Sequence, residues 1–390
     1  MTATRMVVEV LNKDLEKVAE IKNLYPINKE GIILRYSKEL SDWGKAAFRM
    51  RSNDPVFDDL GDIVQPHTYS VRIKRGASTV WQGVIVDNPQ RTKNFVEVTA
   101  NEYLYYLDKI LIRRSSNNPA TNAADDLYRI FASGTMATAV TNLVNNAVSD
   151  FGANHPLSGM TIGTIENPDY PVGFTNGTTA LTGAWNFSTT VQLQFDFHSV
   201  FYVVKAFGIY TDADFEIDEN LVFNFKKFLG NKHNDIVFQY GPRGNIIDYN
   251  APRLGKRMAN TLWGVAADTN GQVYHLKQED STSLLANGKL EDVIPYADVK
   301  DNNFLRSRLA QDLQFLKTPD DSPLNILLNE QGYPLGQYDI GDIVTVKIED
   351  NVIDYQAPRR IVGITVNLHD TGRELITVQT NRPRDKDLGN

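Results

Sequence analysis

Apolar and polar side chains alternate along much of the first hundred residues, a period of two that is typical of strands with one buried face. A turn at residues 76 to 78 separates two such runs. From residue 103 the apolar spacing changes to three and four, which predicts a short helix before the polar run of residues 115 to 119. We therefore place a first boundary near residue 112. The alternating apolar positions are Val71, Ile73, Val80, Val84, Val86, Val96, Val98 and Ala100.

The middle of the chain mixes helices, loops and strands. Apolar residues keep to one helical face from Met136 to Phe151, and Ser133 is the expected N-cap of this helix. Residues 152 to 188 are rich in Gly, Thr, Asn and Pro, which predicts loops with a short hairpin. The remaining elements predicted here are a strand at residues 191 to 197, a helix from Val200 to Phe207 between Ser199 and Gly208, and a hairpin at residues 215 to 225.

The last third of the chain returns to strands after one helix. Apolar residues at helical spacing predict this helix from about Asn302 to Leu316, and Pro319 and Pro323 are expected to end it. Four apolar runs then follow closely, with the spacing of a small antiparallel barrel or sandwich. These runs are residues 326–328, 343–348, 361–368 and 375–380, and the charged tail 384–390 is expected to fray.

An internal repeat is the most informative feature of the sequence. A gapless shift of 280 residues places residues 61–64 on residues 341–344, and both read Gly-Asp-Ile-Val. The same shift places Gly83 on Gly363 and keeps the apolar faces of two later strands in phase, which a one-residue slip would destroy. Turns and strands of this kind are common, and the residues between the matches differ, so chance is the alternative. The repeat predicts two similar β-barrels, one at each end of the chain.

These patterns predict an α+β fold that is mostly β, with two similar small β-barrels at the chain ends and a helix-containing α/β insertion between them. Two similar units in one chain suit a ring, because a closed trimer then presents six similar units to a sixfold partner. The expected division is a first barrel at 1–111, the insertion of helices and strands at 112–235, connecting strands and a helix at 236–318, a second barrel at 319–383 and the tail at 384–390.

Composition and charge narrow the class of function. The 390 residues carry 40 Lys and Arg against 48 Asp and Glu, a net charge of −8, which disfavours general attraction to nucleic acid or anionic membranes. The absence of cysteine excludes disulfides, thiolate nucleophiles and cysteine-ligated metals. The first residues form only short apolar runs broken by charge, so we expect neither a signal peptide nor a membrane anchor.

Several short stretches follow one another in a recognisable order along most of the chain. They are residues 81–86, 215–223, 244–246, 259–261 and 280–288, the helix with Leu309 and Ala310, Pro319, and finally residues 341–344 and 360–364. In this order they resemble the baseplate hub family of bacteriophage tails, which includes the central hub of contractile tails and the N-terminal part of tail-associated lysins. Asn287 stands where such proteins often have tyrosine before a glycine. The sequence shows no lytic domain after the last barrel, so we expect a separate chain to open the cell envelope.

The resemblance implies a structural virion protein at the tail tip or baseplate, assembled in the host cytoplasm. Hubs of this family are trimers that close the tail tube and join its sixfold symmetry to a threefold spike or fibre. The implied partners are two further copies of the chain, a ring of distal tail or tube protein, a central spike or tail fibre, and the tape-measure protein. Genomic DNA would pass only in transit, along an acidic wall that does not bind it, and no membrane insertion is implied.

Candidate chemistry in the sequence is weaker than the structural interpretation. No two of the six histidines stand four residues apart as in a helical zinc site, and no serine elbow, Walker loop or Gly-x-Gly-x-x-Gly occurs. Acidic and apolar residues alternate from Asp212 to Asp218 without a glycine at the sixth position, which favours a solvated hairpin face over a calcium loop. We therefore expect no catalytic, cofactor-binding or metal-binding residues and no enzyme activity.

The candidate residues are structural or interfacial. Gly83 and Gly363 permit close approach or a bulge, and Asp62 and Asp342 lead into corresponding strands. Trp185 lies in a polar stretch and is expected to be an exposed anchor for a neighbouring subunit. A carbohydrate-binding or carbohydrate-cleaving tail or surface protein, with a glycan held by residues 152 to 188, is the alternative function. The full set is Gly61, Asp62, Gly83, Gly341, Asp342, Gly363 and Trp185, with Arg253, Lys256 and Arg257 as a small surface patch and Asp280 and Ser283 as a helix cap.

Overall fold

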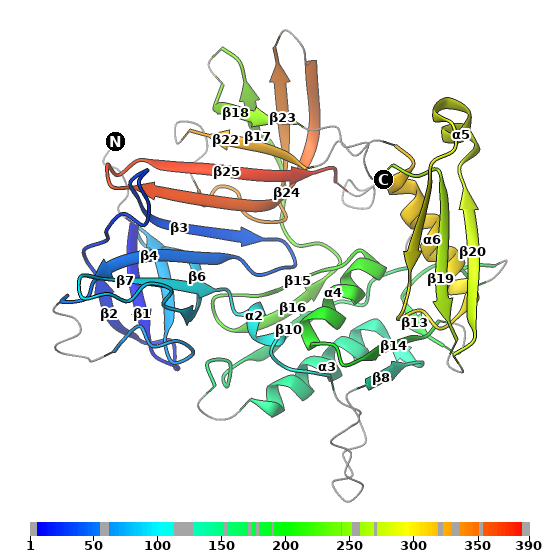
Figure 1. Ribbon diagram of the computed structural model, residues 1–390, viewed down its shortest axis with the longest axis horizontal. Helices are drawn as coiled ribbons and strands as arrows, with labels where there is room; N and C mark the ends of the chain where they lie inside the picture. Colours follow the sequence, from blue (N-terminus) through cyan, green and yellow to red (C-terminus); the bar gives the residue numbers. More distant parts are fainter. Residues whose placement is uncertain are drawn as a thin grey trace, which may run out of the picture.

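The computed structural model shows an α+β fold that is mostly β (Figure 1). The part of the chain that it describes contains no helix long and apolar enough to cross a membrane. The described residues are 6–54, 62–112, 128–151, 155–170, 174–176, 179–188, 191–242, 244–251, 258–268, 271–318, 323–329, 335–350 and 354–383. The predicted fraying of residues 384–390 and the patch of Arg253, Lys256 and Arg257 lie outside them.

One large sheet runs through the molecule and contains strands from both ends of the chain. Its N-terminal strands are β1 (Met6–Leu11), β2 (Lys17–Ile21), β3 (Ile32–Glu39), β4 (Lys45–Arg51), β5 (Ser70–Arg75), β6 (Ser78–Asp87) and β7 (Phe95–Asn101). Its C-terminal strands are β17 (Lys232–Tyr240), β18 (Ile246–Asn250), β22 (Leu324–Leu328), β23 (Ile343–Glu349), β24 (Asp354–His369) and β25 (Glu374–Asn381).

The order of these strands brings the two ends of the chain together in the middle of the sheet. The main order is β18-β22-β25-β24-β3-β4-β7-β6-β5-β1-β2, and β17 joins it through β23, which pairs with β24. β17 and β18, which the sequence places in the connecting region, thus belong to the same sheet as the last four strands (Figure 1). No barrel closes through the pairings of the described residues, so the two barrels remain a prediction.

A unit of four strands occurs twice within this sheet. The N unit has the order β4-β7-β6-β5, the C unit has the order β22-β25-β24-β23, and all neighbours within both units are antiparallel. The pairing register agrees as well. Ile85 pairs with Ala100 in the N unit, Ile361 pairs with Thr380 in the C unit, and a bulge follows directly after each pair. The repeat that the sequence predicts is therefore present in strand order, pairing sense and register.

The residue equivalences differ from those of the gapless shift. The shift holds for β7 and β25, but the register of the hairpins puts Asp87, not Gly83, at the position of Gly363. The predicted equivalence of the two glycines is therefore wrong. The hairpin that joins Ile361 to Thr380 is longer than its counterpart in the N unit, which a comparison without gaps cannot accommodate.

Helix α3 (Met136–Asp150) lies in the insertion and begins slightly later than predicted. Its N-cap is Thr135, whose hydroxyl accepts a hydrogen bond from the backbone N–H of Thr138 at 3.1 Å. Ser133 is thus not the cap, although its hydroxyl is of the right type. The apolar face that predicted the helix is buried as expected, with Val140 and Val144 fully covered.

Helix α4 (Val200–Thr211) begins at its predicted cap but extends past its predicted end. The Ser199 hydroxyl accepts from the N–H of Tyr202, as a capping serine should. The helix continues through Gly208 and stops where Asp212 takes the left-handed conformation, with a φ of 52°. Gly208 serves close packing instead, since an added Cβ would lie 2.9 Å from the carbonyl oxygen of Ala213.

The hairpin after α4 forms as predicted and belongs to a small sheet of its own. β15 (Asp214–Ile217) pairs antiparallel with β16 (Val222–Lys226), and β10 (Thr161–Ile165) pairs parallel with β16. Helix α2 (Leu104–Leu107) precedes the insertion. The remaining short elements of the insertion are β8 (Tyr128–Phe131), β9 (Gly134–Thr135), β11 (Thr175–Asn176), β12 (Thr179–Ala180), β13 (Asn186–Phe187) and β14 (Leu193–Asp196).

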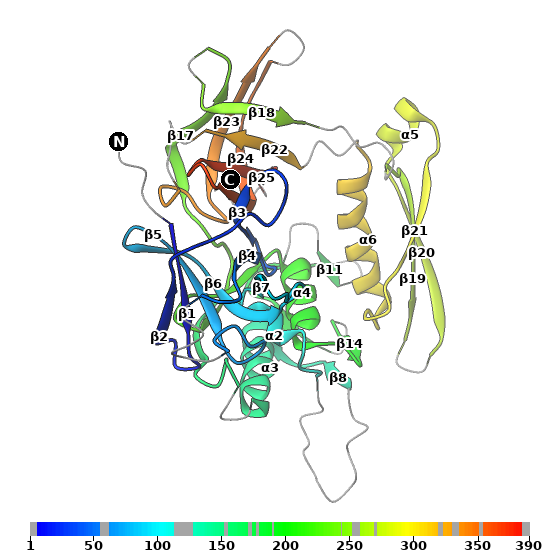
Figure 2. The ribbon, with the colours of Figure 1, turned by 60° about the vertical axis from the view of Figure 1, so that its left-hand side comes forward.

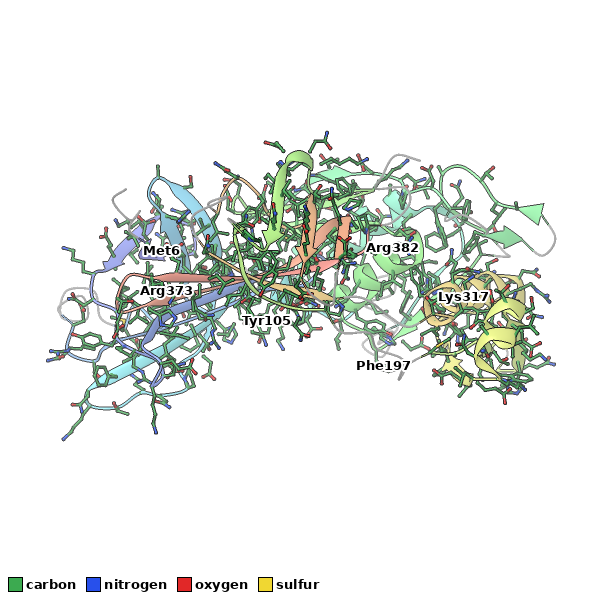
Figure 3. All side chains as sticks on the ribbon, turned by 90° about the horizontal axis from the view of Figure 1, so that it is seen from above. Met6, Tyr105, Phe197, Lys317, Arg373 and Arg382 are labelled. Carbon is green, nitrogen blue, oxygen red and sulfur yellow. The ribbon has the colours of Figure 1, made fainter. Side chains whose placement is uncertain are left out.

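Residues 261–316 form an arm beside the rest of the molecule (Figure 2). The arm contains a sheet of β20 (Val273–Glu279), β19 (Thr261–Ala267) and β21 (Glu291–Pro295), the short helix α5 (Ser281–Asn287), and helix α6 (Asn302–Leu316), which covers one face of the sheet. α6 has the predicted bounds, and Asp280 caps α5 as predicted. Seen from above, Met6 and Arg373 lie toward one end of the molecule and Lys317, at the end of α6, lies toward the other (Figure 3).

Two buried apolar clusters hold these parts together. One fills the interior of the large sheet and includes residues of both units, among them Phe48, Ile85, Ile326 and Ile361. The other joins the insertion to the arm and includes Phe207 of α4 with Phe304 and Leu309 of α6. Because the N unit and the C unit share one hydrophobic core, they form one structural domain rather than two separate ones.

Candidate functional site

The two units meet where β3 pairs with β24. Residues 34–39 of β3 run antiparallel to residues 363–368 of β24, and β3 also pairs with β4 of the N unit. Across this pairing the Arg35 Nε donates to Oδ1 of Asn367 at 2.6 Å. β3 therefore connects the N unit to the C unit, and we call this strand pairing the in-chain junction.

A buried ion pair lies close to this junction and ties the insertion to the C unit. The Arg360 guanidinium, on β24, contacts both carboxylate oxygens of Asp214, on β15, at 2.6 and 3.3 Å. Both side chains are about 95% buried. Arg360 also donates to the carbonyl oxygens of Gly341 and Leu229 and lies over the ring of Phe228. A guanidinium with this many partners is fixed in position, because its planar donors fit a carboxylate and two carbonyls at once.

Asp342 is the second buried acid of this region. One oxygen of its carboxylate accepts from the backbone N–H of Asn231, at 2.6 Å, and the other accepts from the N–H of Asp339 at 2.8 Å. The Nε2 atom of His233 lies 3.0 Å from the second oxygen. Asp342 therefore ties the beginning of β17 to the loop before β23, a more extensive role than the turn expected from its sequence.

Asp62 does not share this role. Its side chain is 40% exposed and forms an ion pair of 2.7 Å with the exposed Arg91. Residues 63 and 64 form a turn, whereas Ile343 begins β23, so the two Gly-Asp-Ile-Val motifs have different structures. The prediction that both aspartates lead into corresponding strands is wrong for Asp62, and Gly61 lies outside the described residues.

Two of the three predicted glycines that the structure describes lie where the backbone leaves little room. An added Cβ on Gly83 would lie 2.2 Å from the carbonyl oxygen of Asn101, and one on Gly341 would lie 2.1 Å from that of Leu229. Gly363 lies at the bulge in β24 and is less crowded, because its nearest neighbour would be the Gln379 side chain at 3.3 Å. Close approach therefore requires glycine at Gly83 and Gly341 but not at Gly363.

We expect Gly341→Ala to lower the free energy of unfolding by about 2 to 3 kcal/mol. Gly341 has a φ of +88°, which strains any residue with a Cβ, and the new methyl group would collide with a backbone atom that cannot rotate away. Urea unfolding followed by circular dichroism measures the change. Gly363→Ala is the matched control and should cost less than about 1 kcal/mol, since Gln379 can move; equal losses in the two variants would contradict this assignment.

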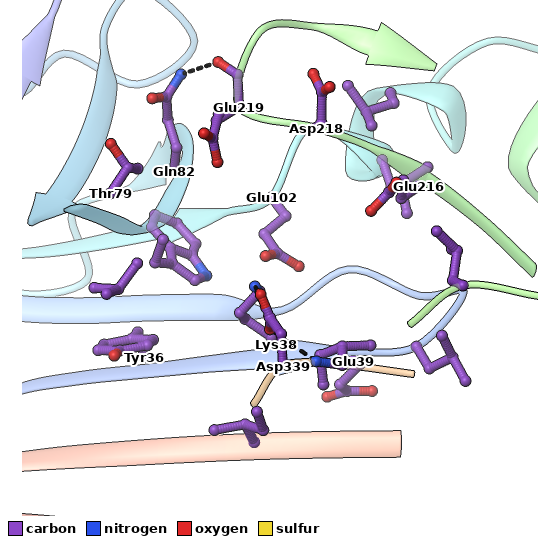
Figure 4. A pocket seen from close by; sticks show the side chains of 18 of the residues that line it. Tyr36, Lys38, Glu39, Thr79, Gln82, Glu102, Glu216, Asp218, Glu219 and Asp339 are labelled. Atoms are coloured by element: carbon purple, nitrogen blue, oxygen red, sulfur yellow. Dashed lines mark hydrogen bonds and ion pairs between the residues drawn. The ribbon is translucent and has the colours of Figure 1, made fainter. Parts of the chain in front are cut away.

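A cavity of about 340 Å³ lies between the in-chain junction and the hairpin of β15 and β16 (Figure 4). Lys38 extends into it and forms an ion pair with Asp339 at 2.6 Å, while the carboxyl group of Glu102 lies on the other side of Lys38 (Figure 4). Acidic side chains outnumber basic ones in the lining, which includes Glu39, Asp42, Glu102, Glu216, Asp218, Glu219 and Asp339 against Lys38 and Arg75.

Burial raises the pKa of the Glu102 carboxyl to about 7, although Lys38 and the backbone N–H of Gly44 both favour its ionised form. The pKa of Glu39 is raised for the same reason, with a further contribution from Asp42. The cavity therefore takes up protons at mildly acidic pH. Carboxyls of this kind destabilise the fold when they are ionised, because they lose hydration without gaining enough positive charge.

We expect Glu102→Gln to remove part of the pH dependence of stability. The pKa of Glu102 in the folded protein lies above its ordinary value of 4.5, so the folded state binds more protons between pH 4.5 and about 7. The contribution of this group to the free energy of unfolding therefore falls as pH rises through that window. Urea unfolding at pH 5 and pH 8 should show the variant gaining stability over the natural chain at the higher pH. A difference that is the same at both values would show that Glu102 titrates normally.

Trp185 is not the exposed anchor that the sequence predicts. Its side chain is fully buried and packs against Tyr170, Phe174, Phe187 and Phe304, with ring centroids 4.8 to 6.2 Å away. Phe304 belongs to α6, so Trp185 helps to attach the arm to the insertion.

The described residues contain no group of three or more His, Asp or Glu side chains arranged to hold a metal ion. The alternating acids after α4 include Asp214, which is 3% exposed, so the expected solvated hairpin face is wrong for that residue. Sequence analysis missed Asp214 and Arg360 as partners. The alternation of acidic and apolar residues did place Asp214 on a strand. No residue near Asp214 in the sequence indicated that it would contact Arg360, which lies 146 positions away.

Comparisons with known proteins identify the fold. No family model matches the sequence, and no curated protein matches it. The 43 kDa tail protein of prophage MuSo2 from Shewanella oneidensis has a TM-score of 0.61 and 12% identity, over 97% of this chain and 99% of its own. The chain has the fold of a phage tail protein. The tail protein from Neisseria meningitidis MC58 has a TM-score of 0.61 and 10% identity, over 97% of this chain and 96% of its own.

A third tail protein extends the likeness. Prophage tail protein gp18 from Listeria monocytogenes EGD-e has a TM-score of 0.54 and 11% identity, over 98% of this chain and 97% of its own. In each comparison nearly the whole of both chains takes part, so the likeness includes the insertion and the arm as well as the large sheet. The resemblance to phage tail proteins that the sequence shows is thus confirmed at the level of the fold.

Proposed function

We propose that the chain is a tail hub protein and that three copies form a ring that closes the end of a phage tail tube. The observation that carries this proposal is the repeated unit, in which four strands share order, pairing sense and register. The shared fold with solved tail proteins supports it. A cyclic trimer of chains with two such units places six similar units around its axis, which matches a sixfold ring of tube or distal tail protein.

The partners follow from this arrangement. One face of the ring would contact the tube or distal tail ring, and the other would hold a central spike or fibre of threefold symmetry, with the tape-measure protein ending at the ring. The protein would work at the tail tip or baseplate of the virion, after assembly in the host cytoplasm. Its net charge of −8 suits a channel through which DNA moves without binding, because carboxylates repel phosphate.

The mass of the purified chain in solution tests the proposal. Light scattering coupled to size exclusion should give three times 43.8 kDa at micromolar concentration, or should do so once tube protein is added. A monodisperse monomer under both conditions would contradict the proposal. Binding energy rather than catalysis is the expected mechanism, so large and stable interfaces are required.

The alternative of a carbohydrate-binding or carbohydrate-cleaving protein places the glycan on residues 152 to 188. The tryptophan of that segment, Trp185, is fully buried and offers no exposed ring on which a sugar could stack. Release of reducing sugar from host envelope would nevertheless establish this alternative directly.

A further inference from the structure

A ring of three hub chains needs two kinds of contact between units, and only one of them lies within a chain. If N and C units alternate around the ring, each N unit has two neighbouring C units. It contacts the C unit of its own chain through the in-chain junction, and it contacts the C unit of the next copy on its other side. Similar units in a pseudo-sixfold ring should use similar contacts at both places. The in-chain junction therefore serves as a template for the contact between copies. This inference rests on the proposed function.

The strand that forms the in-chain junction has a counterpart at the edge of the C unit. β3 pairs with β4 so that Leu34 lies opposite Phe48, and β18 pairs with β22 so that Tyr249 lies opposite Ile326. Phe48 and Ile326 are equivalent, because they pair with Val98 and Val378, which occupy the same place in β7 and β25. β18 is thus the C unit's equivalent of β3.

The counterpart strand has an open edge. β3 is covered on both sides, by β4 and by β24, whereas β18 pairs only with β22 among the described strands. Ile247 on β18 is 41% exposed, and Asp248 and Asn250 are exposed as well. An open strand edge is a template for pairing with another chain, and proteins usually cover or disrupt such edges.

The place on the N unit that would receive β18 is open too. β3 covers β24 from Gly363 onward, and Asp87 is the N unit's equivalent of Gly363. The segment that follows, residues 89–94, is exposed along its whole length. The backbone N–H groups of Arg91 and Lys93 have no hydrogen-bond partner among the described residues, since the neighbouring bonds to β7 use Gln90 and Thr92.

We propose that β18 of one copy adds as an antiparallel strand to residues 89–93 of the N unit of the next copy, which repeats the in-chain junction between chains. The contact is head to tail, and with a threefold rotation it closes into a ring. It deepens the proposed trimer by naming the two segments that hold it together.

Charge and backbone chemistry fit this pairing. The receiving segment carries Lys93 beside Arg91, whose charge is already paired with Asp62. The incoming strand carries Asp248, so Lys93 and Asp248 bring opposite charges to the contact. Pro89 has no N–H and cannot donate to the incoming strand, so the backbone hydrogen bonds should come from Arg91 and Lys93. Proline at this place also disfavours pairing with an unrelated strand.

Engineered cysteines test the contact, because the natural chain has none. If the contact between copies has the pairing register of the in-chain junction, Asn250 lies opposite Arg91 or Thr92. Both positions are tested because the bulge in the hairpin allows the register to differ by one residue. Asn250→Cys combined with Arg91→Cys or with Thr92→Cys should form disulfides between copies on oxidation, since facing strand residues have suitable Cα distances. Non-reducing gels should then show bands at two and three times the chain mass, which disappear on reduction.

Two control pairs make the result decisive. Arg35→Cys with Asn367→Cys lies within the in-chain junction and should link inside one chain, without a change of mass. Asn250→Cys with Lys17→Cys probes β2, another strand that has one partner among the described strands, and should stay unlinked. A disulfide from Asn250→Cys to β2 would overturn the inference. So would the absence of a disulfide to position 91 or 92 in a protein that light scattering shows to be trimeric. Either result would leave the proposed function standing. A monomeric mass both without and with tube protein would contradict the proposed function itself.

Discussion

Replacing Arg360 with methionine should lower the free energy of unfolding by about 3 to 5 kcal/mol. Methionine preserves much of the packing over Phe228 but leaves the Asp214 carboxylate buried without its bidentate partner. The carboxylate keeps the hydrogen bond from the backbone N–H of Leu229, which does not replace a full positive charge. Urea unfolding followed by circular dichroism measures the loss.

The exposed pair of Asp62 and Arg91 supplies the matched control. Arg91→Met removes an ion pair of similar length, 2.7 against 2.6 Å, but in solvent, where its expected contribution is below about 1 kcal/mol. The double variant Arg360→Met with Asp214→Leu should recover part of the loss, because no buried charge is left unpaired. Similar losses in Arg360→Met and Arg91→Met would show that the buried pair is not a tie between the insertion and the C unit.

Trp185→Ala should also lower the free energy of unfolding by about 3 to 5 kcal/mol. The substitution empties a fully buried site that contacts four aromatic rings, and one of these, Phe304, belongs to the arm. We expect the arm to detach first, since it shares this cluster with the insertion. Hydrogen exchange should therefore increase in α6 before it increases in the large sheet.

Trp263→Ala is the appropriate comparison for that variant. Trp263 lies on the outer face of the arm, is 39% exposed and donates from its indole Nε1 to Glu291 at 3.2 Å. Its loss should cost less than about 1 kcal/mol and leave α6 protected. If Trp185→Ala proved as mild as Trp263→Ala, the indole of Trp185 would have to be an exposed anchor after all.

Elements with local signals were predictable from the sequence. Helix α6 has the predicted bounds, because the helical spacing of its apolar residues and the prolines after it indicate the same end of the helix. The hairpin of β15 and β16 forms where two runs of alternating apolar and polar residues flank Glu219 and Asn220. Ser199 caps α4 as expected. These features depend on residues a few positions apart, so a single sequence contains the information.

The repeat was predictable in outline but not in detail. Val96 and Val98 do correspond to Ile376 and Val378, and all four are buried in the same core. The Gly-Asp-Ile-Val identity, which first indicated the repeat, is not a structural equivalence. It aligns residues 63 and 64, which form a turn, with residues 343 and 344, which begin β23. Bulges and a longer hairpin shift the register between strands, and a comparison without gaps cannot follow such shifts.

Contacts between distant segments could not be predicted. The ion pair of Arg360 and Asp214 depends on the return of the chain from the insertion, and the burial of Trp185 depends on the position of α6. Neither residue has a local pattern that indicates its partner. A polar sequence around Trp185 indicated exposure, whereas the surrounding polar backbone forms hydrogen bonds over a buried ring, such as that from Asn167 to the carbonyl oxygen of Trp185.

The acidic cavity beside the in-chain junction adds a feature that the sequence did not indicate. Its carboxyls come from β3 and the residues after it, from the end of β7, from the hairpin of β15 and β16 and from the loop before β23, so only the folded chain brings them together. Through the raised pKa of Glu102, the region around the in-chain junction should respond to pH between about 4.5 and 7.

The central claim is that repeated units in three chains build a ring with six similar positions. Electron microscopy of the purified protein, viewed down the ring axis, tests it most directly. We expect a threefold particle whose inner wall shows six similar densities around a central channel, with the insertions and arms outside. Particles without a ring, or a ring in which the N and C units lie at different radii, would contradict it.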